Sequence, residues 1–188
     1  AYGTGAFTVE FWVYSIGTAA AQVWVINSGL TLNIQRNGSG FYNVYDGTDR
    51  VSTTSVVSNV WNHVAVVRTG TGTNQTNLYV NGVSVLNWTS AVNYGADNFA
   101  LSGSATFPCT CYISNVRVVK GTAVYTAAFT PPTAPLTAIS GTSLLTCQSA
   151  THRDNSTNAF AITAVGDAKP RAYNPFGYTN ALTTGYST

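Results

Sequence analysis

Hydrophobic and polar residues alternate along most of this chain, which is the pattern of β-strands. In FTVEFWVYS, at residues 7–15, every second residue from Phe7 to Val13 is Phe or Val, whereas the positions between them include Glu10 and Trp12. Since successive side chains of a strand point to opposite faces of the sheet, each of these two sets shares one face. Both faces carry aromatic residues, so we expect this strand to lie in the centre of a sheet.

Similar runs recur at short intervals, and turn-forming pairs separate them. We predict further strands at residues 23–27, 30–35, 41–46, 63–68, 77–80, 83–88, 111–120 and 143–148. LYVNGVSV predicts a two-residue hairpin, because Asn81 and Gly82 tolerate the positive φ angles of a type I′ turn. No window of 11 or more residues has the apolar spacing of an amphipathic helix. The predicted fold class is therefore all-β, a two-sheet antiparallel β-sandwich of the jelly-roll type.

Prolines interrupt this rhythm in FTPPTAPLTA, at residues 129–138. Proline cannot donate a hydrogen bond to a sheet and favours extended backbone, so we expect a strap that crosses the sandwich. We predict one domain, in which residues 1–130 form the sandwich and residues 131–188 form the strap and the C-terminal strands. Those strands either complete the sandwich or pair with a neighbouring copy. The sequence contains no methionine, so we expect that Ala1 is not the translational start.

The chain carries few charges. Charged residues make up 7% of it, against about 25% in typical soluble domains. The eight Lys and Arg residues are scattered and give a net charge of +2, so the basic patch that nucleic-acid binding requires is missing. No apolar run approaches the ~20 residues that cross a bilayer, so we expect no membrane insertion. A polar surface with few charges suits a virion or extracellular protein, whose contacts use aromatic and neutral hydrogen-bonding groups.

Four segments occur in an order that is typical of a known family. They are FTVEFWVYS, WNHVAVVRTG, NLYVNGV and YISNVRVVKGTAVYTAAFTPP. In this order and spacing, over roughly residues 5–130, the chain resembles the laminin-G-like, concanavalin A-like jelly-roll domains. The resemblance implies the same sandwich and a role in adhesion or assembly.

The sequence from residue 116 to residue 163 is similar to a version of this domain in virion proteins of tailed bacteriophages, notably phages of cyanobacteria. There it occurs in long structural or fibre proteins. This resemblance implies a virion location, with identical copies or other virion proteins as partners and a cell-surface polysaccharide as a further partner. Two functions stay open: a virion structural, fibre or decoration protein that adheres to host glycans, and a secreted or cell-surface bacterial carbohydrate-binding adhesin.

Catalysis finds little support in the sequence. Retaining glycan hydrolysis requires two carboxylates about 5–5.5 Å apart, and the laminarinase-type relatives of this fold use two glutamates on one strand. This chain has one glutamate, Glu10, and no carboxylate lies two or four residues from it. His63 and His152 have no nucleophile motif beside them. We interpret all three residues as structural and expect no enzyme activity.

Sugar binding needs aromatic faces together with groups that form hydrogen bonds to hydroxyls. The candidate ligand-binding residues lie in or near predicted loops and edges, and they are Tyr42, Tyr45, Asp46, Trp88 and Tyr94. For each of them, packing in the core or at a sheet edge is the alternative interpretation. Trp12, Trp24 and Trp61 lie within predicted strands, and we assign them to the core.

Metal binding is a weaker expectation. We expect no cofactor, although the resemblance implies that such sandwiches sometimes hold one calcium ion at the rim through aspartates and backbone carbonyls. The candidate ligands here are Asp46, Asp49 and Asp97. A turn formed by Asp46 and Gly47 explains Asp46 without a metal.

The three cysteines, Cys109, Cys111 and Cys147, are too few for a disulfide framework. We interpret them as small buried hydrophobic residues. A disulfide that joins Cys147 to Cys109 or to Cys111 is the alternative if the chain matures outside a reducing cytosol, and it would leave one free thiol.

Overall fold

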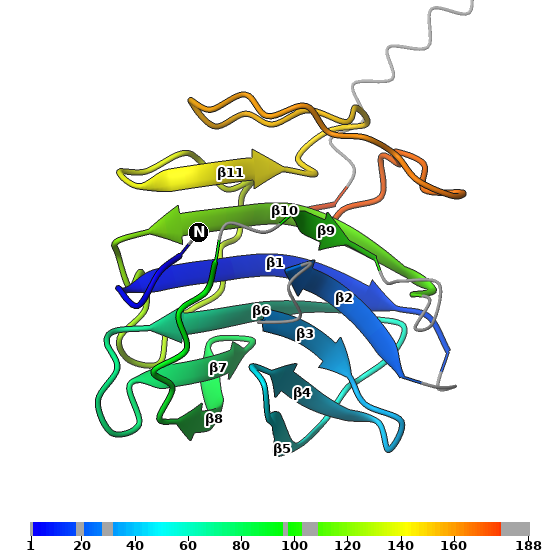
Figure 1. Ribbon diagram of the computed structural model, residues 1–188. Helices are drawn as coiled ribbons and strands as arrows, with labels where there is room; N and C mark the ends of the chain where they lie inside the picture. The colour runs from blue at the N-terminus through cyan, green and yellow to red at the C-terminus, as the bar shows by residue number, and fades with distance from the viewer. Residues whose placement is uncertain (1, 18–20, 28–31, 96–97, 103–108, 178–188) are drawn as a thin grey trace, which may run out of the picture.

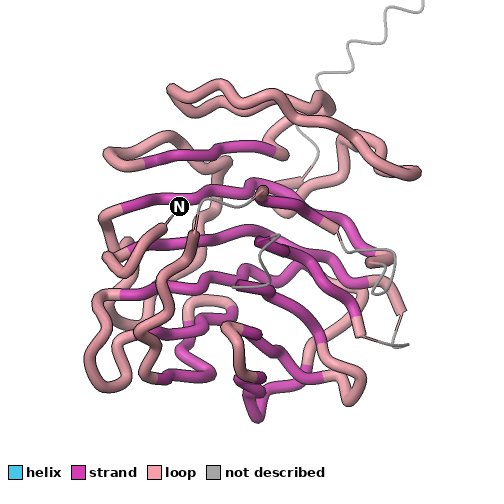
Figure 2. Tube along the Cα trace, in the orientation of Figure 1, coloured by secondary structure: helices cyan, strands magenta, loops and turns pink. Residues whose placement is uncertain are grey.

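The computed structural model describes residues 2–17, 21–27, 32–95, 98–102 and 109–177. These residues form β-strands joined by turns and loops (Figures 1 and 2). The strands are β1 Phe7–Ser15, β2 Gln22–Asn27, β3 Leu32–Arg36, β4 Phe41–Tyr45, β5 Asp49–Ser55, β6 Trp61–Arg68, β7 Thr76–Val80, β8 Val83–Trp88, β9 Phe99–Leu101, β10 Cys111–Lys120 and β11 Thr142–Thr146. Within the described ranges no helix is long and apolar enough to cross a membrane.

The strands form two antiparallel sheets. The six-stranded sheet has the order β11-β10-β1-β6-β7-β8, and the five-stranded sheet has the order β5-β4-β3-β2-β9 (Figure 1). Both the all-β prediction and the two-sheet prediction are therefore confirmed. β5 was not expected, because its sequence DRVSTTS is polar, and it lies at the edge of its sheet, where most of its side chains are exposed or half-buried.

β1 lies in the centre of the six-stranded sheet, between β10 and β6, as its two aromatic faces predict. Its residues Phe7, Val9, Phe11 and Val13 are fully buried between the sheets. They pack in one core cluster with Trp24 from the opposite sheet and with residues of β3, β4, β6, β7 and β10. Burial of each such side chain contributes about 1.5–3 kcal/mol, so this inner face supplies much of the drive to fold.

The hairpin between β7 and β8 has the predicted two-residue turn. Val80 pairs with Val83, and both turn residues have positive φ angles, 48° at Asn81 and 81° at Gly82. The side chain of Asn81 also accepts a hydrogen bond from the backbone N–H of His63, at 2.8 Å. The turn is thus fixed by the neighbouring strand as well as by its own backbone preference.

A strap of residues 121–138 crosses the outer face of the six-stranded sheet, the face that points away from the core. Tyr125 and Phe129 stack on each other with ring centroids 3.6 Å apart, and Phe129 also contacts the rings of His63 and Tyr79. The backbone N–H of Phe129 donates to the carbonyl of Gly82 at 3.0 Å. The strap therefore buries one half of this outer face.

The chain after β11 folds back along the edge of the six-stranded sheet (Figure 1). The backbone N–H of Asn155 donates to the carbonyl of Leu145 at 2.7 Å, and the N–H of Leu145 donates to the Asp154 carboxylate at 3.0 Å. These bonds satisfy backbone groups of β11 that an open edge would leave to water.

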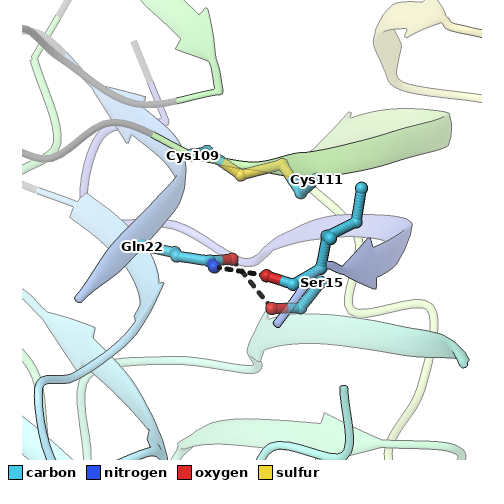
Figure 3. Close-up of a disulfide and its surroundings, with 5 residues drawn as sticks. Ser15, Gln22, Cys109 and Cys111 are labelled. Carbon is cyan, nitrogen blue, oxygen red and sulfur yellow. Dashed lines mark hydrogen bonds between the residues drawn. A yellow bond between two sulfur atoms is a disulfide. The ribbon is translucent and has the colours of Figure 1, made fainter. Parts of the chain in front are cut away.

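The cysteines do not pair as the sequence suggested. Cys109 and Cys111 form a disulfide, with Cα atoms 5.5 Å apart, near Gln22 (Figure 3). The side chain of Gln22 accepts the hydroxyl of Ser15 at 2.8 Å and donates to the carbonyl of Ile16 at 3.3 Å. Cys147 is free and half-buried. The carbonyl of Cys147 accepts a hydrogen bond from the backbone N–H of Asn115. Cys147 therefore lies beside Asn115 of β10, four residues after Cys111. The interpretation of all three cysteines as unpaired buried residues is therefore wrong for Cys109 and Cys111, and the alternative disulfide to Cys147 does not form.

Candidate functional site

Two of the five predicted sugar-binding residues meet in a buried hydrogen bond. The indole Nε1–H of Trp88 donates to Oδ2 of Asp46 at 2.8 Å, and Nε of Arg50 donates to Oδ1 at 3.1 Å. Both Asp46 and Trp88 are buried. Since protein donors occupy both oxygens of Asp46, this carboxylate joins β8 to the turn after β4.

Two of the three predicted tyrosines are packed in the core. Tyr42 is buried against Trp24, and Tyr94 is buried against Phe7, with ring centroids 5.7 and 5.3 Å apart. Sugar stacking needs an exposed ring face, and neither tyrosine presents one. Tyr45, at the end of β4, is half-buried and keeps part of its ring accessible.

The aspartates proposed for calcium are placed as follows. Asp49 accepts a hydrogen bond from the side-chain amide of Asn43 at 2.8 Å, and Asp46 is held as described above. Asp97 lies outside the described residues. In the described part of the chain, no group of three or more His, Cys, Asp or Glu side chains lies together.

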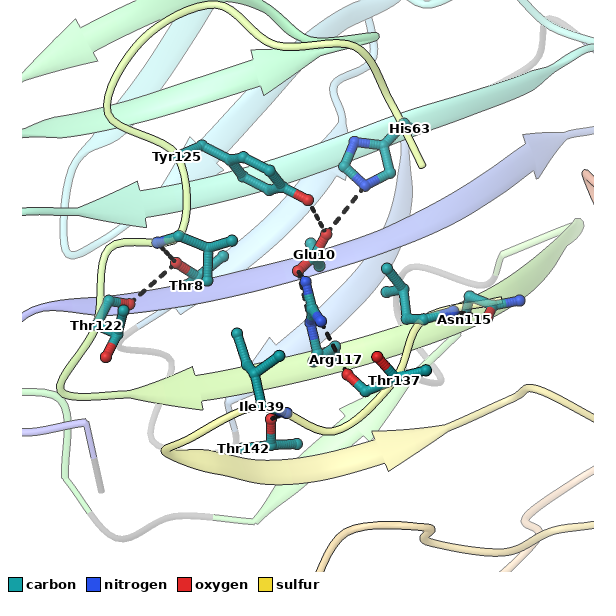
Figure 4. Close-up of polar contacts among 12 residues, drawn as sticks. Thr8, Glu10, His63, Asn115, Arg117, Thr122, Tyr125, Thr137, Ile139 and Thr142 are labelled. Atoms are coloured by element: carbon teal, nitrogen blue, oxygen red, sulfur yellow. Dashed lines mark hydrogen bonds and ion pairs between the residues drawn. The ribbon is translucent and has the colours of Figure 1, made fainter. Parts of the chain in front are cut away.

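Glu10 is the centre of a buried polar network beneath the strap (Figure 4). Its Oε1 accepts hydrogen bonds from Nε and Nη2 of Arg117 at 2.8 and 2.6 Å. Its Oε2 accepts the hydroxyl of Tyr125 at 2.7 Å and lies 3.2 Å from Nε2 of His63. Arg117 also donates to the carbonyl of Thr137 at 2.9 Å. The network therefore ties three strands to both ends of the strap.

The charge state of Glu10 follows from these contacts. Burial by itself would raise the pKa of Glu10, but the hydrogen bond to His63 and the positive charge of Arg117 outweigh burial and hold the pKa below its ordinary value. The ionised carboxylate can only accept hydrogen bonds, so Nε2 of His63 is the donor. Among the described residues, the partners of Glu10 are Arg117, Tyr125 and His63, and none of them is a second carboxylate.

The part of the outer face that the strap does not cover carries a cluster of aromatic side chains. Tyr14 of β1 pairs with Trp61 of β6 on one side and with Tyr112 of β10 on the other. Its ring contacts theirs at centroid distances of 5.7 and 5.9 Å. Tyr173, from the C-terminal segment, contacts all three rings at 5.1–5.3 Å. These four residues, Tyr14, Trp61, Tyr112 and Tyr173, are called the aromatic cluster below.

Two of the tryptophans assigned to the core by their position in strands also lie on this outer face. Trp61 belongs to the aromatic cluster, and Trp12 contacts His63 and Phe176, with ring centroids 5.2 and 6.0 Å apart. Both side chains are half-buried, whereas Trp24 is fully buried, as expected. The assignment of Trp12 and Trp61 to the core was therefore wrong, because alternation along a strand does not show which face the second sheet covers.

Two open hollows adjoin the aromatic cluster. The first, called the tyrosine hollow, has a volume of about 500 Å³ and is lined by Tyr14, Ile16, Asn59, Tyr112, Arg171, Ala172 and Tyr173. The second, called the charged hollow, has a volume of about 300 Å³ and is lined by Ile16, Ser102, Cys109, Thr110, Cys111, Tyr112, Asp167, Ala168, Lys169 and Arg171. The two hollows share Ile16, Tyr112 and Arg171, so they are neighbouring parts of one surface.

The two antiparallel sheets define a β-sandwich of the jelly-roll type. The Laminin_G_3 family, described as the concanavalin A-like lectin/glucanases superfamily, matches residues 1–128. The chain therefore belongs to this superfamily. No curated protein sequence matches it.

Solved structures share the fold at low sequence identity. A candidate carbohydrate-binding protein from Bacteroides ovatus matches with a TM-score of 0.62 and 17% identity, over 84% of this chain and 51% of the other. This chain thus spans about half the length of the Bacteroides protein. Domain 4 of an extracellular GH43 arabinanase from Geobacillus stearothermophilus, in complex with arabinotriose, matches with a TM-score of 0.51 and 16% identity, over 65% and 64% of the two chains.

A third similar structure is the binding domain of botulinum neurotoxin DC in complex with SialylT. It matches with a TM-score of 0.50 and 11% identity, over 65% of this chain and 33% of the toxin domain. Identities this low establish the shared fold alone.

Proposed function

We propose that this protein is a non-enzymatic carbohydrate-binding module and that the tyrosine hollow is its glycan site. The observation that carries the proposal is the meeting of half-buried tyrosine rings from two strands and a distant segment around one open hollow. A volume of about 500 Å³ lies within the range of ligand pockets. The hollow is large enough to receive part of an oligosaccharide.

The chemistry of the lining suits sugars. Tyrosine combines an apolar ring, which can pack on the apolar face of a pyranose, with a hydroxyl that can bond to the ligand or to water. Exposed Asn59 and Arg171 lie at the same hollow and offer amide and guanidinium groups to sugar hydroxyls. The cross-strand pairing of Tyr14 with Tyr112 fixes two of the rings on a rigid sheet.

Two structural neighbours support this class of ligand. The Bacteroides protein is described as a candidate carbohydrate-binding protein, and the arabinanase domain was solved with arabinotriose. Hydrolysis is not part of the proposal, because the sole glutamate is enclosed by Arg117, Tyr125 and His63 and has no carboxylate partner.

We propose further that the module acts outside the cell, as part of a virion fibre or of a bacterial surface adhesin. The disulfide between Cys109 and Cys111 favours an oxidising compartment. The low content of charged residues, 7%, favours contacts between neutral surfaces of identical copies. A symmetric oligomer in light scattering after size-exclusion chromatography is the expected result, and a stable monomer at high concentration would count against assembly through identical copies.

The glycan site is tested by binding to a glycan array, followed by calorimetry with the best oligosaccharide. We expect saturable binding that Tyr112→Ala weakens at least tenfold. Tyr45→Ala is the matched control, because it removes a half-buried tyrosine from the other sheet. Binding that both variants leave unchanged, or an array without any signal, would refute the proposed site.

A further inference from the structure

Most charged side chains of this protein serve the fold. Arg117 pairs with Glu10, and Arg50 pairs with Asp46. Arg68 is fully buried and donates to the carbonyls of Gly3, Gly5 and Val92 at 2.6–3.0 Å. The chain has only eight Lys and Arg residues, so those that do not take part in such internal contacts are few.

Two of these remaining cations lie at the same place. Lys169 and Arg171 both line the charged hollow, and Arg171 lines the tyrosine hollow as well. Both residues are exposed, and no described carboxylate lies within ion-pair distance of either. Asp167 lines the charged hollow too, so its two cations and one carboxylate give this surface one net positive charge.

We infer that the glycan bound by this protein is acidic, and that its carboxylate or sulfate group binds Arg171 and Lys169 in the charged hollow. This inference rests on the proposed glycan site. A guanidinium matches the two oxygens of such a group with two parallel N–H donors, and an ammonium adds a mobile point charge. Arg171 lies at the junction of the hollows, so a sugar ring can pack in the tyrosine hollow while the acidic group of the same or the next residue reaches the charged hollow.

Covalent and strand-pairing contacts hold the part of the charged hollow that β10 forms. Cys109 and Cys111 are joined by their disulfide, and Tyr112 follows them directly on β10, where it pairs with Tyr14. The neutral and the charged parts of the surface are therefore connected through two adjacent residues of one strand. This continuity is what allows one oligosaccharide to contact both.

The test compares an acidic oligosaccharide with its neutral form. Trigalacturonate and its methyl ester share the same sugar backbone, and the ester neutralises the carboxylates while adding a methyl group to each. A sulfated oligosaccharide and its desulfated form give the corresponding comparison for sulfate. Calorimetry at low salt is expected to show about tenfold tighter binding of one acidic member over its neutral form, because hydrogen bonds between charged partners are stronger than those between neutral groups. High salt is expected to weaken that preference.

Variants test whether Lys169 and Arg171 cause the preference for the acidic oligosaccharide. The double variant Lys169→Gln and Arg171→Gln is expected to lose the preference for the acidic form. The ratio of the two affinities is the readout, because Arg171 also lines the tyrosine hollow and its loss weakens binding of the neutral form as well. The matched control is Lys120→Gln with Arg153→Gln, which removes the same charge from exposed positions that line neither hollow. The control is expected to retain the preference.

Several results separate this inference from the proposed glycan site. Equal affinity for acidic and neutral forms, together with binding that depends on Tyr112, would overturn the acidic inference and leave the glycan site standing. A preference that the control variant loses to the same degree would also overturn it. Absence of binding to any oligosaccharide, acidic or neutral, would overturn both.

Discussion

Glu10 shows that the surroundings of a residue decide its role. The fold includes hydrolases that place glutamates on a sheet face, but here the single glutamate accepts hydrogen bonds from Arg117, Tyr125 and His63. Both oxygens of this carboxylate accept hydrogen bonds from the protein, and no second acid is among its partners in the described part of the chain. Its contribution is to hold the strap against the sheet, and removal of its charge should therefore be seen in stability.

Glu10→Gln is expected to lower the free energy of unfolding by about 3–5 kcal/mol, because it leaves the buried Arg117 guanidinium without its counter-charge. Urea denaturation followed by tryptophan fluorescence measures the change. Tyr125→Phe removes one hydrogen bond to the carboxylate and is expected to cost less, ~1.5–3 kcal/mol.

The double variant Glu10→Gln with Arg117→Met provides the control for this explanation. It removes both charges, so it should be more stable than Glu10→Gln alone. A double variant that is less stable than either single variant would show that the pairing of charges is not the cause.

Among the elements, the strap and the hairpin after β7 depend on each other. Gly82 has a φ angle of 81°, and a Cβ atom on it would overlap the carbonyl oxygen of Phe129. The N–H of Phe129 donates to the carbonyl of Gly82, so the two backbones lie in direct contact. Only glycine meets both the conformational and the steric requirement at this position.

Gly82→Ala is expected to destabilise the protein by about 3 kcal/mol or more, since the cost of a positive φ adds to that of the overlap with the strap. Gly47→Ala is the matched control, because Gly47 has a φ of 95° but no atom within 4 Å of the place that a Cβ atom would take. The control should cost only ~1–2 kcal/mol. Thermal unfolding measures both, and equal losses would show that the strap does not press on the hairpin.

Sequence patterns were sufficient for the elements but not for the site. Period-2 alternation located most strands, and the pair Asn81 and Gly82 identified the hairpin. The same alternation could not tell that the outer face of β1 is covered near Glu10 and open near Tyr14. Trp88 was a candidate sugar-binding residue because it lies at the end of a predicted strand, but its indole donates to buried Asp46.

The residues that complete the candidate site come from far along the chain. Tyr173 and Arg171 meet Tyr14 across more than 150 positions, and no local pattern marks that contact. One signal was available: the register of β1 with β6 and β10 aligns Tyr14 with Trp61 and Tyr112. Strand pairing, once inferred from the family, would have shown an aromatic row on the outer face.

At the scale of the whole molecule, the C-terminal third of the chain packs on the outer face of the six-stranded sheet and divides it into two regions with different roles. The strap encloses ionised and hydrogen-bonded groups around Glu10, and this half stabilises the fold. The segment that carries Arg171 and Tyr173 packs on the other part and forms one wall of the hollow that holds the proposed glycan site. The turn at Asp154 secures the chain between the two segments, since its carboxylate accepts the backbone N–H groups of Leu145, Ser156 and Phe160.

This arrangement predicts that the protein loses stability in acid. Burial would raise the pKa of Glu10 and of Asp154, but Arg117 and His63 at Glu10, and the backbone N–H groups at Asp154, hold both pKa values below their ordinary ones. The unfolded chain therefore takes up protons first, near pH 4, where ordinary Glu and Asp carboxyls titrate. The stabilisation is complete above that pH and is lost as the pH falls toward the lower pKa values of the folded state.

The free energy of unfolding, measured by urea titration from pH 7 to pH 2.5, is expected to be nearly constant down to about pH 5 and then to fall. Two carboxyls that titrate together give a slope of at most roughly 3 kcal/mol per pH unit. Asp154→Asn and Glu10→Gln should each start less stable at pH 7 and show a shallower fall, because each removes one of the two groups that bind protons on unfolding. If both variants kept the slope of the unaltered protein, other carboxyls would control its acid sensitivity, and the network around Glu10 would not be what links stability to pH.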